Sequence, residues 1–213
     1  MGFSLPRFYA ILDPSQAGGR SPAEVCEILL AAGVRLIQYR DKRASARILF
    51  DRSRILAERV RRAEGVFIVN DRADVARSAE AHGVHVGQED LPVELARRVV
   101  GPEGIVGFST HSLEQLAEAD RSSADYVAYG PIFATLSKEK PDAVVGLEGL
   151  KAARKATHKP LVAIGGITLE TAPAVLEAGA DSVAVISGLL AAADLGARAK
   201  AFLRILGETP AGL

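Results

Sequence analysis

The sequence has a single cysteine, no net charge and no long hydrophobic run, and each shortage excludes a class of protein. Of 213 residues, 26 are Lys or Arg and 26 are Asp or Glu. Such a chain has no global positive field, which argues against nucleic-acid binding, so any anion site must come from local placement of side chains. One cysteine cannot form an internal disulfide. Cys26 lies in an apolar helical pattern, which favours a buried thiol over a nucleophile.

The N-terminal segment lacks a basic stretch followed by an apolar core, and no run approaches the length of a membrane span. The sequence therefore predicts a soluble, cytoplasmic protein in a reducing compartment. With 48% hydrophobic residues, the chain can form one large domain. No composition break or long linker indicates a second one. We expect one domain over residues 1–213, with a loose tail from about 207 to 213.

Eight short apolar, β-branched runs alternate with helical patterns. Strands that alternate with helices over short connections must be parallel, with right-handed crossovers. Eight such units predict an α/β fold closed into a (β/α)8 TIM barrel. An open doubly wound sheet is the alternative, but no Gly-x-Gly-x-x-Gly follows an early strand. A TIM barrel has its active site at the C-terminal ends of the strands. The expected strands are 8–12, 35–39, 66–69, 84–86, 105–108, 126–129, 161–164 and 182–186.

Typical capping residues mark the ends of the expected helices. Three hydroxyl residues are placed to accept hydrogen bonds at helix N-termini. Three glycines are placed to end helices in the left-handed conformation. The expected N-caps are Ser21, Ser112 and Thr168, and the expected C-caps are Gly33, Gly83 and Gly179.

Polar clusters follow several of the expected strands. In the first, Gln38, Arg40 and Lys42 are spaced two apart, so on an extended strand they point to the same side and form a fork of donors. A lone arginine at a strand end is usually just solvated. Three donors in register favour a binding site for an anion.

Two carboxylates, Asp71 and Asp90, follow consecutive strands. Because neighbouring strands lie about 4.8 Å apart, the pair can share one hard cation such as Mg²⁺, with waters and phosphate completing its shell. Two plainer interpretations stay open: Asp90 as a helix N-cap, and Asp71 as a turn residue or a partner of Arg72. A diphosphate with about three negative charges, one Mg²⁺, these two aspartates and three cations form a nearly neutral site. The cations are Arg40, Lys42 and Lys138.

A second anion site is predicted near the last strands. The long irregular connection 132–146 carries hydroxyl groups and a lysine, which is typical of a lid or binding loop. Gly165-Gly166 and Ile186-Ser187 follow the seventh and eighth strands, where barrels bind phosphate; a simple tight turn is the alternative for the glycine pair. His111 is either a general acid or base or a structural residue beside a helix cap, and His85 is expected to pack inside the barrel.

These motifs together make the sequence resemble the thiamine phosphate synthase (thiamine-phosphate pyrophosphorylase) family over nearly its whole length. Six segments of that family occur here in order. They are Gln-x-Arg-x-Lys, Asn-Asp-Arg, Gly-Val-His-x-Gly-Gln-x-Asp, Gly-x-Ser-x-His, Gly-Pro-x-x-x-Thr-x-Ser/Thr-Lys and Gly-Gly-Ile. The chain departs from the family at Ala134, where proline is usual, and at Ser137, where threonine is common. These departures predict a less preorganised loop with its function intact.

The resemblance implies a transferase that joins hydroxymethylpyrimidine diphosphate to a (carboxy)thiazole phosphate. Diphosphate leaves first, and the thiazole nitrogen captures the resulting pyrimidine carbocation. Implied for the pyrimidine diphosphate are Gln38, Tyr39, Arg40, Asp41, Lys42, Asn70, Ser109 and Lys138. Implied for the thiazole phosphate are Thr135, Leu136, Ser137, Gly166, Ile186 and Ser187. One Mg²⁺ would be held by Asp71 and Asp90, and the implied catalytic residues are Arg40, Lys42, Ser109 and Lys138.

Two other functions remain open on the sequence. A thiazole tautomerase of the same fold resembles the chain around His111, although that relative lacks the paired acids and the donor fork. A barrel without catalytic activity that only binds a phosphate ligand would not require Asp71 and Asp90 together. The expected partners are small-molecule substrates, with no nucleic acid and no membrane, and homo-oligomerisation is left open.

Overall fold

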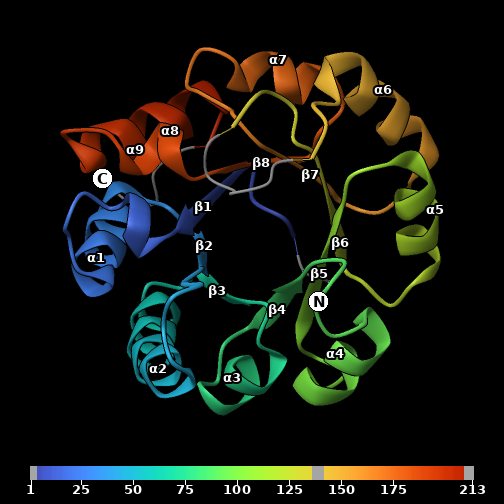
Figure 1. Ribbon diagram of the computed structural model, residues 1–213. Coiled ribbons are helices and arrows are strands. Elements are labelled where there is room, and N and C mark those ends of the chain that lie inside the picture. Colours follow the sequence, from blue (N-terminus) through green and yellow to red (C-terminus); the bar gives the residue numbers. More distant parts are fainter. Residues whose placement is uncertain (1–3, 136–141, 209–213) are drawn as a thin grey trace.

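The computed structural model describes residues 4–135 and 142–208. Eight parallel strands form a closed barrel in sequence order, with β8 paired to β1, and helices surround them (Figure 1). The strands are β1 (Phe8–Leu12), β2 (Leu36–Tyr39), β3 (Val66–Asn70), β4 (Gly83–Val86), β5 (Ile105–Thr110), β6 (Tyr126–Tyr129), β7 (Leu161–Ile164) and β8 (Ser182–Val185). The predicted TIM barrel is confirmed, and each predicted strand boundary lies within two residues of the observed one.

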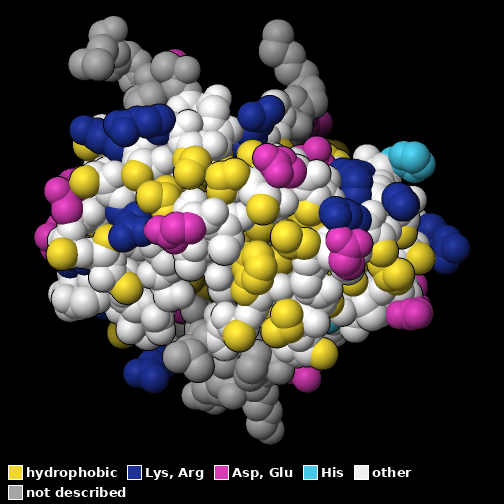
Figure 2. All heavy atoms as spheres, turned by 90° about the horizontal axis from the view of Figure 1, so that it is seen from above, with side chains coloured by type: hydrophobic (Ala, Val, Ile, Leu, Met, Phe, Trp, Pro, Cys, Tyr) yellow, Lys and Arg dark blue, Asp and Glu magenta, His cyan; other side chains and the backbone are white. Residues whose placement is uncertain are grey.

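The helices form the outer layer. They are α1 (Pro22–Ala32), α2 (Ala46–Arg62), α3 (Ala73–Ser78), α4 (Val93–Val100), α5 (Leu113–Arg121), α6 (Gly146–Ala156), α7 (Ala172–Glu177), α8 (Ser187–Leu190) and α9 (Leu195–Ile205), with a 3-10 turn at Pro14–Gln16. None of the helices described is long and apolar enough to cross a membrane. On the face around α7, side chains of both charge signs surround a central group of hydrophobic ones (Figure 2).

The barrel separates two hydrophobic cores. Side chains alternate along each strand, so in β1 Tyr9 and Ile11 belong to the small core inside the barrel. Phe8, Ala10 and Leu12 pack in the larger core between barrel and helices. The interior is therefore filled by side chains and is not a channel.

Most of the predicted helix ends are confirmed. The Ser21 side chain accepts a hydrogen bond from the Glu24 amide at 3.2 Å, and Gly33 ends α1 with φ 104°. Ser112 caps α5 and Gly179 has φ 109°.

Two of the capping predictions are wrong. The N-cap of α7 is Thr171, because Thr168 lies three residues earlier and donates its own amide to the Thr171 hydroxyl. Gly83 does not end a helix in the left-handed conformation. It begins β4, where a Cβ atom would lie 2.0 Å from the Ile105 carbonyl oxygen, so the close approach of β5 requires glycine there.

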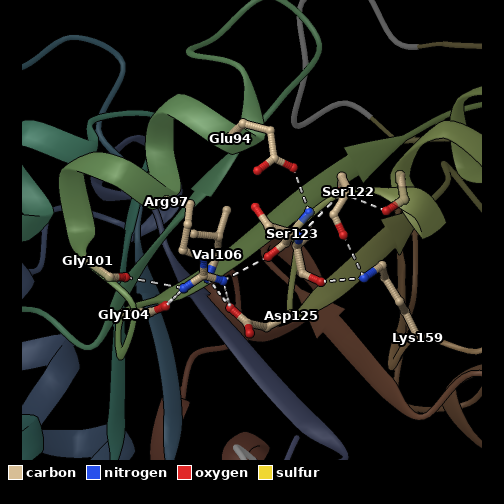
Figure 3. A network of polar contacts seen from close by, with 11 residues as sticks. Glu94, Arg97, Gly101, Gly104, Val106, Ser122, Ser123, Asp125 and Lys159 are labelled. Carbon is tan, nitrogen blue, oxygen red and sulfur yellow. Dashed lines mark hydrogen bonds and ion pairs between the residues drawn. The ribbon is translucent and has the colours of Figure 1, made fainter.

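Polar contacts join the N-terminal ends of β5, β6 and β7, away from the predicted site (Figure 3). The Arg97 guanidinium donates to the carbonyl oxygens of Gly104 and Ser123 and pairs with Asp125. Lys159 donates to the Ser122 carbonyl oxygen at 3.0 Å. These contacts satisfy backbone carbonyl groups that lie beyond the sheet ladder.

We expect Arg97→Ala to lower the free energy of unfolding by about 2 kcal/mol, because two carbonyl groups lose this donor and Asp125 keeps only the Val106 amide. Its neighbour Arg98 is exposed and serves as the matched control, Arg98→Ala. Urea unfolding measures the difference. Equal stability of the two variants would contradict the role given to Arg97.

The two residues Gly207 and Glu208, which follow α9, are held by hydrogen bonds. Gly207 has φ 72°, the Glu208 amide donates to the Leu203 carbonyl oxygen at 2.8 Å, and the Glu208 side chain accepts from the Arg7 amide. The first two residues of the predicted loose tail are therefore held against the barrel. Residues 209–213 lie outside the described part of the chain.

Candidate active site

A cavity of about 580 Å³ opens at the C-terminal ends of the strands, where the fold predicts a site. Most predicted site residues line it: Gln38, Arg40, Lys42, Asn70, Asp71, Asp90, Ser109, Thr135, Gly166, Ile186 and Ser187. Leu136, Ser137 and Lys138 lie outside the described residues. A second cavity of about 550 Å³, lined by Leu5, Arg154 and Asp181 among others, contains none of the predicted residues.

Tyr39 and Asp41 are not brought into the cavity. Tyr39 points away from the barrel interior and is buried against the helix layer. Its hydroxyl donates to Asp41 at 3.0 Å, and Arg52 of α2 donates to the same carboxylate at 2.9 Å. Strand alternation explains the difference, since Tyr39 and Asp41 are offset by one position from the residues that face the cavity. Their contacts hold the segment that carries Arg40 and Lys42.

Arg40 has a partner that the sequence reasoning missed. Its guanidinium pairs with Asp13, which directly follows β1 and is 4% exposed. Asp13 also accepts a hydrogen bond from the Ser15 amide at 2.9 Å, which fixes the carboxylate. The same signal that was used elsewhere, a polar residue at a strand end, could have found Asp13. The pair holds the arginine at the edge of the cavity.

The two predicted metal ligands lie side by side. Asp71 has the left-handed backbone conformation, with φ 62°, and its amide donates to the His85 carbonyl oxygen at 2.7 Å. Asp90 accepts a hydrogen bond from the Gly87 amide at 2.7 Å. Burial raises the pKa of Asp71, the Lys42 ammonium opposes that rise, and the Asp90 carboxylate adds to it. Aspartate is among the non-glycine residues that adopt this conformation most readily, and such backbone positions cluster at functional sites.

This carboxylate pair fits a magnesium ion that keeps part of its shell for other ligands. Among the described residues, no group of three His, Cys, Asp or Glu side chains could hold a metal. Two carboxylates alone suit Mg²⁺, which retains waters and substrate phosphates. The Lys42 ammonium pairs with Asp71, so the pair already attracts a cation.

The opposite side of the cavity is built from glycines. Gly165 and Gly166 have φ of 103° and 64°. A Cβ atom would lie 2.5 Å from the Pro131 Cβ at the first position and 2.4 Å from the Ala134 carbonyl oxygen at the second. Both positions therefore need glycine for the close approach of the chain after β6 as well as for the turn. Ser187, the first residue of α8, lies on the same side.

His111 lines the cavity but is held by the protein. Its Nδ1 lies 2.7 Å from the Gly130 carbonyl oxygen, and its Nε2 lies 3.5 Å from Asp142. The Gln115 side chain accepts from its backbone amide at 2.7 Å. These contacts tie the histidine to the connection after β6, which favours the structural interpretation over proton transfer.

Neither Cys26 nor His85 is placed as a charged reactive group, although His85 lines the cavity. Cys26 is fully buried, and burial raises the pKa of its thiol to about 12. His85 packs inside the barrel as predicted, and burial lowers its pKa to about 4. The thiol and the imidazole are therefore neutral near pH 7.

Stability is expected to fall on acidification through His85. In the unfolded chain His85 binds a proton with the ordinary histidine pKa of 6.5. In the folded chain its pKa is about 4, so it stays neutral until the pH falls that far. Unfolding is therefore favoured as the pH falls from 6.5 towards 4, and we expect a loss of about 2 kcal/mol between pH 7 and pH 5 from this residue. Urea unfolding of the protein and of His85→Gln at both pH values isolates it. Equal pH dependence of the two would contradict the assignment.

The chain is similar to known proteins over nearly its whole length. A model of the family described as thiamine monophosphate synthase matches residues 8–189. The chain belongs to the thiamine monophosphate synthase family. The thiamine-phosphate synthase of Koribacter versatilis is 53% identical over 210 residues, covering 96% of this chain and 98% of that protein. That of Chloroflexus aurantiacus is 43% identical over 203 residues, covering 95% and 94%.

A solved structure agrees with this assignment to the thiamine monophosphate synthase family. The thiamine phosphate pyrophosphorylase from Pyrococcus furiosus is 34% identical and superposes with a TM-score of 0.86, covering 94% of this chain and 95% of that one. These matches confirm the family and the thiamine phosphate synthase activity that the motifs predicted, and with them the enzyme class, a transferase.

Proposed function

We propose that the chain couples hydroxymethylpyrimidine diphosphate with a (carboxy)thiazole phosphate to give thiamine phosphate and diphosphate, with CO2 as a further product when the thiazole carries the carboxylate. The observation that carries the proposal is the division of the cavity. One side holds Arg40, Lys42 and the carboxylate pair. The other side holds Gly165, Gly166 and Ser187. Two anion-binding regions that face one cavity suit two phosphorylated substrates whose reacting carbon and nitrogen meet between them.

The diphosphate is assigned to the side of β2, β3 and β4. Arg40 and Lys42 donate to its oxygens there, and Lys138 is expected to join them. Asp71 and Asp90 would hold one Mg²⁺, which when bound neutralises negative charge on the leaving diphosphate. The Lys42 contact with Asp71 supports this placement, because it puts the ammonium beside the carboxylate pair.

The reaction needs no protein nucleophile. Departure of diphosphate leaves a pyrimidine carbocation, which the thiazole nitrogen then captures. Fixed positive charge around the leaving group stabilises the transition state, and an apolar wall keeps water away from the cation. Ile11, Val162 and Ala184 supply such a wall at the cavity floor.

The thiazole phosphate is assigned to the side of β6, β7 and β8. Glycine at 165 and 166 lets the backbone approach an anion closely, and the Ser187 and Thr135 side chains lie on the same cavity. Ile186 lies beside them.

The single buried thiol suits a reducing compartment such as the cytoplasm.

The test is a coupling assay with purified protein, both substrates and Mg²⁺. We expect thiamine phosphate and diphosphate in equal amounts, and little product in excess chelator. Metal-independent coupling would refute the magnesium assignment. Fast interconversion of thiazole tautomers without coupling, abolished in His111→Ala, would instead support the tautomerase.

A further inference from the structure

A chain of hydrogen bonds crosses the barrel interior at the floor of the cavity, which Tyr9 and His85 also line. Gln38 Nε2 lies 2.7 Å from the Tyr9 hydroxyl, which lies 2.8 Å from the Tyr126 hydroxyl. The Tyr126 hydroxyl lies 3.0 Å from His85 Nδ1, and His85 Nε2 lies 2.8 Å from Ser109 Oγ. The chain thus connects two predicted site residues, Gln38 at one end and Ser109 at the other, through three residues for which the coupling reaction gives no role.

The barrel is built to hold this chain. Tyr9 and Tyr126 are 1% and 0% exposed, and their rings meet edge to face at 6.0 Å. On β5, a Cβ atom at Gly107 would lie 2.1 Å from Tyr126 Cζ and 2.5 Å from His85 Nδ1. The absence of a side chain at Gly107 therefore makes room for the Tyr126–His85 contact.

The orientation of the Gln38 amide sets the direction of the first two bonds of the chain. Because Nε2 can only donate, the Tyr9 oxygen accepts, and the Tyr9 hydrogen goes to Tyr126. Continued in the same direction, Tyr126 donates to His85 Nδ1, and a neutral His85 carries its hydrogen on Nε2 and donates to Ser109. With the amide held this way, the reverse order would leave the buried Tyr9 hydroxyl hydrogen without an acceptor among the described residues, which is costly.

We propose that Tyr9, Tyr126 and His85 are positioning residues that fix the hydrogen-bonding polarity of the two cavity residues at the ends of the chain. Ser109, which accepts from His85, presents its hydroxyl hydrogen to the cavity. Gln38, which donates to Tyr9, presents its Oε1 atom, which has no hydrogen-bond partner among the described residues. The inference rests on the proposed function: diphosphate oxygens only accept hydrogen bonds, and the amino group of an aminopyrimidine donates them.

The direction of the chain is measurable without substrate. In ¹⁵N NMR of the ligand-free protein, which has four histidines, His85 is identified by the signal that is lost in His85→Gln. We expect the Nε2–H tautomer. The Nδ1–H tautomer in a protein that still couples the substrates overturns this inference and leaves the proposed function intact. The Nε2–H tautomer in a protein without coupling activity supports the bond direction and refutes the proposed function.

The consequence for binding is tested with Tyr126→Phe, which removes only the hydroxyl. We expect the KM for the pyrimidine diphosphate to rise about 10-fold, since Ser109 and Gln38 lose their fixed polarity, with the KM for the thiazole phosphate unchanged. His85 should also show a mixture of tautomers. The matched control is Tyr129→Phe: Tyr129 lies on the same strand, is 3% exposed and faces the helix layer.

The positioning role would be overturned if the KM rose equally for both substrates. It would also be overturned if the KM and the His85 tautomer were both unchanged. If Tyr126→Phe does not fold, Tyr9→Phe breaks the chain one bond earlier and has the same expected result. Whether or not these variants fold, the His85 tautomer in the unmodified protein gives the direction of the hydrogen-bond chain.

Discussion

Asp71→Asn is expected to lower kcat/KM by at least about 100-fold at any Mg²⁺ concentration that saturates the unmodified enzyme. Asparagine keeps the size and the left-handed backbone preference of the residue but removes the charge. A site that loses one of two carboxylates holds Mg²⁺ weakly, so the leaving diphosphate loses much of the fixed charge that stabilises its departure, a loss of the size seen when one electrostatic contact is removed. Initial rates over a Mg²⁺ titration measure this directly.

The matched control for this variant is Asp74→Asn. Asp74 is close in the chain and pairs with Arg72 on the surface, away from the cavity lining. We expect its Mg²⁺ dependence to equal that of the unmodified enzyme. If Asp71→Asn regained full activity at high Mg²⁺, the carboxylate would contribute affinity alone. If it kept full activity at all concentrations, the metal assignment would be wrong.

Gly166→Ala should raise the KM for the thiazole phosphate by about 100-fold or more while leaving the KM for the pyrimidine diphosphate nearly unchanged. The added Cβ would lie 2.4 Å from the Ala134 carbonyl oxygen and 2.8 Å from the Phe133 Cβ, at a residue with φ 64°. The strand-end segments must therefore separate, and a misplacement of about 1 Å at a binding site can cost about 100-fold. Steady-state kinetics with each substrate varied in turn give both constants.

Gly101→Ala separates backbone strain from the local clash. Gly101 also has a positive φ, 90°, but a Cβ there meets nothing within 4 Å, and the residue lies at the end of α4 outside the cavity lining. Gly101→Ala should lower the free energy of unfolding without changing the KM for either substrate. Equal effects of Gly166→Ala on both substrates would contradict the division of the cavity into two anion sites.

The barrel itself was predictable because its signals are local. Apolar runs bounded by glycine and polar residues mark each strand, and the end of each strand marks the mouth where Gln38, Arg40, Asp71 and Asp90 gather. Chemistry at strand ends depends on the fold class more than on exact packing. Beyond the end of a strand, the sequence predicted less reliably which side of the barrel wall a residue faces. Tyr39 and Asp41, taken with their neighbours in one motif, face the helix layer or the loop instead.

The contacts that the sequence did not indicate depend on closure of the barrel. Tyr9 of β1 meets Tyr126 of β6 across the interior, 117 residues away in the chain. No periodicity in either segment reports that meeting, because each tyrosine alone fits an ordinary core position. Asp13 is different, since it follows β1 as Asp71 follows β3. Its pairing with Arg40 needed only the same strand-end rule, applied to the first strand.

In the proposed function, the carboxylate pair and the donor fork together bind a metal-bound diphosphate on one side of the cavity. A crystal structure of the protein with Mg²⁺ and inorganic diphosphate tests it most directly. We expect one metal ion between Asp71 and Asp90, with the diphosphate held by Arg40 and Lys42. Diphosphate bound at Gly166 and Ser187 instead, with no metal between the two aspartates, would contradict it.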